Sequence, residues 1–259
     1  MKKLKIQRKL KNFNSNVKTK INNEIKRKGK KGFIWEIIFG FLIFCASAVL
    51  IFVLYIIISA PNFDKDKLYK KEATVIYDKN GVEFARVGQE DRELIEYKDL
   101  PQVYIDALIA TEDSRFFQHN GLDIARFLKA SVGQLVSSKA GGASTITMQL
   151  VKKTYTNGAS KGIAGIIRKF TDIYMAVFKI ESSYTKEEIL EFYSNSLWYA
   201  NGRSINTTGI YGIEQASQHF FGKSVRDLNL AEASLIVGMY QNPRLYNPYN
   251  NPVGCRNRQ

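Results

Sequence analysis

The stretch ATEDSRFFQHNGLD, residues 110–123, gathers side chains that could carry out proton transfer. Glu112 and Asp113 are adjacent, and they are followed by two phenylalanines and by His119, one of only two histidines in the 259-residue chain. A carboxylate can act as a general base when it lies within hydrogen-bonding reach of the proton it removes. An acid pair at a helix end is more often simply solvated, so this stretch alone does not establish a catalytic site.

The surrounding pattern is helical and places the acid pair at a helix end. From Asp99 apolar residues recur on one face, so we expect a helix that delivers Glu112 and Asp113 at its C-terminal end. Further helices are expected over 124–136, 143–155, 166–183, 185–199 and 228–240. Thr185 and Glu188 have the spacing of a capping box. The glycine-rich stretch 156–165 is expected to form a mobile loop over the cleft. The pattern predicts a mainly α domain with about six helices.

The positive charge of the chain is concentrated at its N-terminus. The net charge is +14, but residues 1–32 alone hold 13 Lys and Arg against the single acid Glu24. The rest of the chain is therefore nearly neutral, which argues against nucleic acid as a partner of the folded part. A basic tail of this kind is expected to attract anionic lipid headgroups.

An uncharged apolar run follows the basic tail directly. It covers Ile37–Ala60, 24 residues, and as a helix it would span roughly 36 Å against a hydrocarbon core of about 30 Å. It is too long for the core of a signal peptide. We expect one transmembrane helix, with the lysine-rich side in the cytoplasm and residues from about 61 onward outside.

A short connector is expected between the membrane and the helical domain. ATVIYDKNGVEFARV contains two β-like runs around Lys79-Asn80-Gly81, the pattern of a β-hairpin. The two cysteines, Cys45 and Cys255, fall in the apolar run and near the C-terminus, so no disulfide framework is expected. No Cys/His metal spacing is present either.

Four ordered sequence blocks resemble the bacterial peptidoglycan glycosyltransferases, the transglycosylase domain of class A penicillin-binding proteins and of monofunctional biosynthetic transglycosylases. The blocks are ATEDSRFFQHNG, GGASTITMQLVKK, RKFTDIYMAVFKIESSYTKEEILEFYSN and GIYGIEQASQHFFGKSVRDLNLAEASLIVGMYQNPRLYNP. Four blocks in order are far more specific than a lone acid pair. The resemblance covers roughly residues 68–255.

The resemblance implies a mainly α, lysozyme-like glycosyltransferase domain preceded by one transmembrane helix and a short β-hairpin connector. It divides the chain into a basic cytoplasmic tail (1–32), the transmembrane helix (33–60), a juxtamembrane connector (61–98) and the glycosyltransferase domain (99–259), with a C-terminal end shorter than in relatives. The implied reaction polymerises lipid II into β-1,4 glycan strands at the outer face of the cell membrane, with release of undecaprenyl diphosphate. No transpeptidase domain is expected in this chain.

The resemblance also assigns roles to particular residues. Glu112 matches the general base, and Asp172 stands where the family carries a second catalytic glutamate. The departing diphosphate needs charge neutralisation, which cationic side chains can supply. The residues expected to bind substrate are Asp113, Phe116, His119, Ser144, Thr145, Gln149, Lys152, Arg168 and Lys169. Lys169 is the weaker candidate of the adjacent basic pair, Ser144 is as readily a helix cap, and His119 is expected to orient the carboxylates.

Two departures from the family pattern bear on activity. Asp172 keeps the negative charge of the family glutamate but is shorter by one methylene, and a displacement near 1 Å can cost on the order of 100-fold in rate. Met148 stands where the family usually has the first of two glutamines, while Gln149, the second, is present.

These departures leave two alternatives to an active transferase. A degenerate, non-catalytic copy could bind lipid II or other wall-synthesis proteins. A lysozyme-like hydrolase could cut glycan with Glu112 as an acid, although a cleaving enzyme has no need of the Lys152 and Arg168 cations. The expected partners are lipid II, the nascent glycan strand, the membrane and other wall-synthesis proteins. Mg²⁺ or Mn²⁺ could assist the diphosphate, but no ligand set for a metal is evident.

Overall fold

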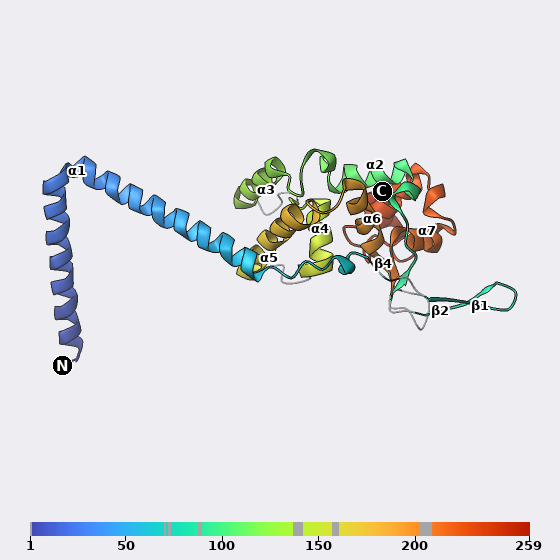
Figure 1. Ribbon diagram of the computed structural model, residues 1–259, viewed down its shortest axis with the longest axis horizontal. Helices are drawn as coiled ribbons and strands as arrows, with labels where there is room; N and C mark the ends of the chain where they lie inside the picture. The colour runs from blue at the N-terminus through green and yellow to red at the C-terminus, as the bar shows by residue number, and fades with distance from the viewer. Residues whose placement is uncertain are drawn as a thin grey trace. The chain divides into compact units, whose positions relative to one another are not determined.

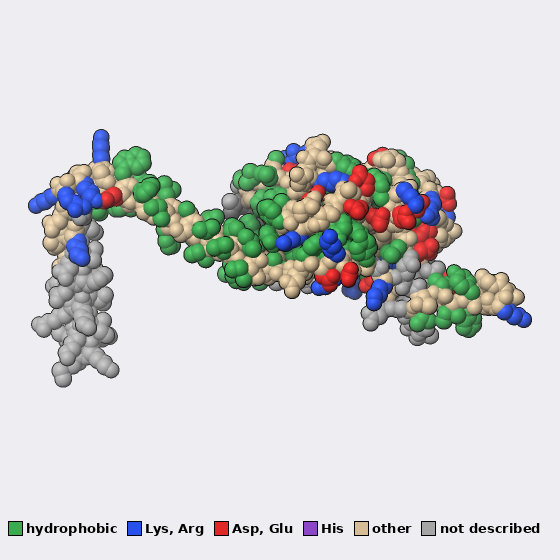
Figure 2. Space-filling view, viewed as in Figure 1, with side chains coloured by type: hydrophobic (Ala, Val, Ile, Leu, Met, Phe, Trp, Pro, Cys, Tyr) green, Lys and Arg blue, Asp and Glu red, His purple; other side chains and the backbone are tan. Residues whose placement is uncertain are grey.

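The computed structural model of the chain describes residues 2–69, 71, 74–87, 90–136, 142–156, 161–201 and 209–259. It divides into two compact units, Met1–Ile58 and Ser59–Gln259. The first unit is formed by helix α1, Lys2–Ser59, whose helical geometry is interrupted at Gly29. Hydrophobic side chains cover its later part (Figure 2). The segment Lys26–Ser59 is long and apolar enough to cross a membrane.

The second unit is mainly helical, as the sequence predicts. Within its described residues the α-helices are α2 (Gln102–Glu112), α3 (Ile124–Val136), α4 (Ile146–Val151), α5 (Gly162–Met175), α6 (Lys186–Ser196), α7 (Ile213–Phe221), α8 (Leu230–Met239) and α9 (Pro252–Arg258) (Figure 1). Two π-helical segments, η4 (Lys152–Thr156) and η5 (Ala176–Ile180), extend α4 and α5. Short 3₁₀ turns cover Lys65–Lys67, Tyr97–Asp99, Phe116–Gln118 and Val225–Asp227.

Helix α4 lies at the centre of the second unit. Its residues Ile146, Thr147, Met148, Leu150 and Val151 are all buried, and it contacts α5 and α6. A short helix that is apolar nearly all round is stable only when other elements enclose it. Helix α2 packs against α8. The helices that carry the first three sequence blocks therefore share one hydrophobic core.

Two small sheets complete the unit. Strands β1 (Thr74–Tyr77) and β2 (Glu83–Val87) form an antiparallel hairpin. The Asp78 carboxylate closes its turn by accepting the backbone N–H groups of Asn80 and Val82 at 2.8 and 2.9 Å. This confirms the predicted hairpin. Strand β5 (Ile210–Tyr211) pairs in parallel with β3 (Asp91–Arg92) and antiparallel with β4 (Trp198–Ala200), a sheet that the sequence did not predict.

Helix boundaries mostly follow local sequence signals, with some exceptions. The Thr185–Glu188 capping box is present at the start of α6, as predicted. Helix α5 begins at Gly162, so the expectation of a loop is wrong for 162–165; residues 157–160 of that stretch lie outside the described part of the chain. Helices α7 and α9 were not predicted. Both are short, which leaves little apolar periodicity to detect.

Candidate active site

A cavity of about 440 Å³ lies where α2, α3, α4, η4 and α5 meet. It is lined by Glu112, Arg126, Gly142, Ser144, Met148, Gln149, Lys152, Lys153, Arg168, Asp172, Tyr240 and Gln241. Of the residues predicted from sequence, the structure brings Glu112, Ser144, Gln149, Lys152, Arg168 and Asp172 together around this one cavity. They come from three of the four sequence blocks.

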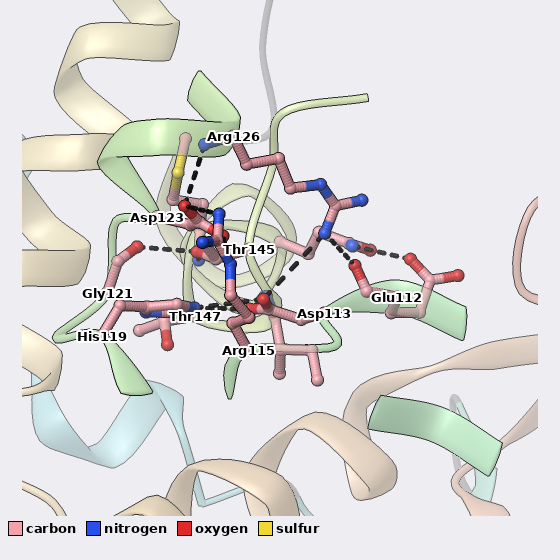
Figure 3. Close-up of polar contacts among 12 residues, drawn as sticks. Glu112, Asp113, Arg115, His119, Gly121, Asp123, Arg126, Thr145 and Thr147 are labelled. Atoms are coloured by element: carbon pink, nitrogen blue, oxygen red, sulfur yellow. Dashed lines mark hydrogen bonds and ion pairs between the residues drawn. The ribbon is translucent and has the colours of Figure 1, made fainter. Parts of the chain in front are cut away.

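Glu112 is the last residue of α2 and is held by two neighbours. Its carboxylate Oε2 accepts a hydrogen bond from Gln149 Nε2 at 2.8 Å, and its backbone carbonyl accepts one from Arg126 Nη1 at 2.9 Å (Figure 3). The Gln149 carbonyl in turn accepts from the hydroxyl of the buried Tyr193 at 3.0 Å. Because Tyr193 fixes the carbonyl end of Gln149, the amide presents its NH₂ group to Glu112.

Burial determines the protonation state of the Tyr193 hydroxyl. Loss of water contact raises the pKa of this hydroxyl well above its ordinary value, and the nearby Glu112 charge adds to the effect. The hydroxyl therefore stays protonated and remains a donor to Gln149 at any physiological pH.

Asp113, unlike its neighbour, points into the protein interior. Its side chain is 0% exposed, and it accepts hydrogen bonds from the backbone N–H of Ile146 at 3.0 Å and from His119 Nε2 at 3.1 Å (Figure 3). Asp113 is therefore not among the residues that line the cavity of Glu112, and its expected contact with substrate stays a prediction. It joins the end of α2 to the start of α4, and its charge lies at a helix N-terminus. His119 contacts this inner carboxylate and lines a separate cavity of about 500 Å³.

Two further predicted substrate ligands are enclosed by the protein. Thr145 is buried and caps α4: its hydroxyl accepts from Met148 N–H at 3.2 Å and donates to the Gly121 carbonyl at 2.7 Å. Phe116 is buried beneath the Lys186 ammonium, 4.3 Å from the ring centroid. Neither residue lines the cavity of Glu112, and their expected contact with substrate stays a prediction.

The helix cap expected at Ser144 is supplied by its neighbour Thr145. Thr145 is the cap of α4, and Ser144 lines the cavity. Its Oγ accepts a hydrogen bond from Lys169 Nζ at 2.5 Å. Lys169 itself does not line the cavity of Glu112 but an adjoining one of about 550 Å³, which shares Gly142, Ser144 and Arg168 with it.

Cationic side chains outnumber acidic ones around the cavity of Glu112. Arg126, Lys152, Lys153 and Arg168 oppose Glu112 and Asp172. Water reaches Lys153, but the protein surrounding its ammonium lowers the pKa through desolvation, and Lys152 lowers it further. Desolvation also lowers the pKa of Lys169. Desolvation is the larger cause of both shifts and the neighbouring cations add to it, so a bound anion would stabilise the charged forms of these lysines.

Asp172 is buried at the cavity wall, and two neighbouring side chains contact its carboxylate. It accepts a hydrogen bond from the Thr156 hydroxyl at 2.6 Å and forms an ion pair with Arg168 one turn earlier on α5. Burial raises the pKa of this carboxyl, while Thr156 and Arg168 act in the opposite direction. Asp172 thus orients Arg168 at the cavity.

Sequence reasoning missed three residues of this site. Arg126 belongs to a helix face with no distinguishing motif, and Tyr193 is one aromatic residue among many. Lys153 could have been found beside Lys152, because the π-helical turn that carries them brings both to the cavity. π-Turns are frequent at functional sites. Among the described residues no group of three or more His, Cys, Asp or Glu could hold a metal ion.

A carboxylate at a helix end, facing several cations across a cavity in a mainly α unit, defines a site suited to group transfer from an anionic leaving group. Comparison with known proteins agrees with this class. Residues 80–259 match the family described as Transglycosylase. The chain therefore belongs to the transglycosylase family.

Individual relatives extend the match toward the N-terminus. The chain is 37% identical over 225 residues to penicillin-binding protein 1A of Neisseria meningitidis, covering 86% of this chain and 27% of that protein. It is 34% identical over 205 residues to penicillin-binding protein 1A of Streptococcus pneumoniae, covering 79% and 27%. Penicillin-binding protein 1A/1B of Bacillus subtilis is 33% identical over 239 residues, covering 90% and 25%. The chain thus spans about a quarter of the length of these relatives.

Proposed function

We propose that this protein is a membrane-anchored peptidoglycan glycosyltransferase that polymerises lipid II into β-1,4 glycan strands. Membership of the transglycosylase family supports the reaction class. The observation that carries the proposal is the placement of Glu112 in one cavity with Lys152, Lys153 and Arg168. The apolar segment of α1 supports anchoring, with the N-terminus in the cytoplasm and the catalytic unit outside.

Each side chain has a defined part in the proposed reaction. The sugar 4-hydroxyl of the acceptor attacks the anomeric carbon of the donor and forms the new C–O bond. Glu112 takes the hydroxyl proton, since Gln149 holds its carboxylate in place. The bond from the anomeric carbon to the phosphate oxygen breaks, and its electron pair leaves with undecaprenyl diphosphate. Lys152, Lys153 and Arg168 stabilise that anion, with Asp172 orienting Arg168.

The test is a polymerisation assay on purified lipid II. We expect Glu112→Gln to lower the rate by about 100- to 10,000-fold, because the amide cannot accept the proton, while lipid II binding is retained. Asp172→Glu, which restores the family side chain, is expected to retain or raise activity. Polymer formation undiminished in Glu112→Gln would remove the assignment of the base.

The same assay separates the alternatives. A non-catalytic module would bind lipid II and form no polymer in the wild type. A hydrolase would digest purified cell wall and leave lipid II unpolymerised. Addition and chelation of Mg²⁺ or Mn²⁺ in the assay would establish the metal dependence.

A further inference from the structure

The π-helical turn η4 carries side chains that contact two different parts of the second unit. Lys152 and Lys153 line the catalytic cavity, and the Thr156 hydroxyl donates to Asp172 at 2.6 Å. Tyr155 instead contacts the segment 61–69, which follows the candidate membrane span and is called the juxtamembrane segment below. One helical turn therefore joins the cations of the site to a segment outside the cavity.

Three residues of the juxtamembrane segment contact Tyr155. The Tyr155 hydroxyl donates to the backbone carbonyl of Asp64 at 2.7 Å. The ring centroids of Tyr155 and Phe63 are 5.9 Å apart, and Lys67 Nζ lies 6.0 Å from the Tyr155 centroid. Loss of water contact raises the pKa of the Tyr155 hydroxyl well above its ordinary value, so the hydroxyl stays protonated and remains a donor.

The juxtamembrane segment is itself fixed to the body of the second unit. The Asp64 carboxylate caps the 3₁₀ turn Lys65–Lys67 by accepting the Asp66 N–H at 3.1 Å. Leu68, directly after that turn, is 1% exposed and belongs to the hydrophobic core. The Tyr155 hydroxyl therefore donates to a carbonyl of defined position. Only four residues separate Asp64 from Ser59, the last residue of the candidate span.

Two features of η4 work against a fixed position for this turn. Lys152 and Lys153 bring like charges to one cavity; burial lowers the pKa of Lys153, and the Lys152 charge lowers it further. The Thr154 hydroxyl is buried and has no hydrogen-bond partner within the described part of the chain, which costs stability. The hydrogen bond from Tyr155 offsets these effects, because it attaches the turn to a segment that is fixed elsewhere.

We propose that Tyr155 is a positioning residue: it connects the juxtamembrane segment to η4 and thereby sets the placement of Lys152 and Lys153 for binding diphosphate. This inference deepens the proposed function and rests on it. It adds that the segment next to the candidate span supports the site directly. Anchoring and catalysis are then linked through a structural contact as well as through proximity to the membrane.

The test compares Tyr155→Phe with the wild type in the full chain, in detergent. The substitution keeps the ring against Phe63 and removes only the hydroxyl. We expect the dissociation constant for inorganic diphosphate to rise about 3- to 10-fold, and kcat/KM for lipid II to fall by a similar factor, because the loss of one hydrogen bond has effects of that size. Both quantities are measured well below the Tm of each variant, so that unfolding does not contribute.

Two further substitutions test whether the effect depends on the juxtamembrane segment. Phe63→Ala removes the packing on the other side of the contact and should act in the same direction as Tyr155→Phe, whereas Phe63→Leu should retain most of the affinity. Tyr184→Phe is the matched control. Lys65 Nζ of the same segment lies 6.0 Å from the Tyr184 ring centroid, but Tyr184 lies outside η4, so its loss should leave both quantities at the wild-type level.

The measurements also separate a positioning role from a purely stabilising one. A contact that only stabilises the fold would lower Tm in Tyr155→Phe and leave the diphosphate affinity of the folded protein unchanged, and an unchanged affinity would overturn the proposal. Losses of equal size in Tyr184→Phe would overturn it as well. Diphosphate binding requires no turnover, so this result is distinct from failure of the proposed function, which would appear as the absence of polymer in the wild type.

Discussion

At the residue scale, the site depends on a chain of contacts that ends at the Glu112 carboxylate. The Tyr193 hydroxyl donates to Gln149, and Gln149 donates to Glu112. Each hydrogen bond restricts the orientation of the next group, so the carboxylate is held toward the cavity by a neutral amide. A cation in direct contact would weaken a general base by stabilising its charged form. The neutral amide of Gln149 positions the carboxylate without adding a positive charge.

Gln149→Ala should therefore reduce turnover more than substrate binding. We expect kcat for polymerisation to fall by about 10- to 100-fold, because a carboxylate displaced by about 1 Å loses its alignment, with KM for lipid II little changed. Tyr193→Phe is the matched control: it frees the far end of Gln149 but leaves the amide in place, so its loss should be smaller. Steady-state kinetics on lipid II would decide, and a Gln149→Ala enzyme with full kcat would contradict this role.

At the element scale, the ends of α2 and α4 meet through buried polar contacts. Asp113 at the end of α2 accepts the Ile146 N–H of α4, and Thr145 links the first turn of α4 to Gly121. Gly121 has a positive φ of 80°, and a Cβ there would lie 3.0 Å from the Ala176 backbone. The first two sequence blocks therefore meet in one set of buried hydrogen bonds between α2 and α4. These hydrogen bonds set the position of Glu112 relative to Gln149.

Removing the Thr145 hydroxyl, which caps α4, should destabilise the contact between α2 and α4. We expect Thr145→Ala to lower the free energy of unfolding by about 1–3 kcal/mol, because it deletes a helix cap and leaves the buried Gly121 carbonyl without a donor. Thr145→Ser keeps both contacts and serves as the control, with a small loss from the missing methyl group. Thermal unfolding of the two variants would measure the difference, and equal Tm values would show that the hydroxyl contributes nothing.

The sequence predicted those features that short-range patterns determine. Apolar periodicity gave the helix over 124–136 with the bounds of α3, and the spacing of Thr185 and Glu188 gave the cap of α6. Motif order also pointed to the cavity residues. Periodicity shows that a helix has a buried face, but not which neighbour covers it. The inward direction of Asp113 and the choice of Thr145 over Ser144 as the cap depend on contacts between segments more than 20 residues apart.

At the scale of the whole molecule, the proposed substrate explains the need for an anchor. Lipid II carries a long apolar chain that keeps its diphosphate at the membrane surface. A catalyst tethered to the same bilayer meets that diphosphate at a raised effective concentration, without any added contact. The apolar segment of α1 has the length and composition to provide this tether. The basic cavity of the second unit would then meet anionic groups confined to two dimensions.

Removing α1 should therefore slow the reaction on membranes and not in detergent. We expect a fragment comprising residues 61–259 to polymerise lipid II in liposomes about 10- to 100-fold more slowly than the full chain, because the tether alone supplies that range of effective concentration. In detergent, where enzyme and substrate are both dispersed, the two proteins should react at similar rates, which also verifies that the fragment is folded. The measurement is the initial rate of glycan formation at equal protein in each medium. A fragment as fast as the full chain in liposomes would mean that the catalytic unit reaches lipid II unaided.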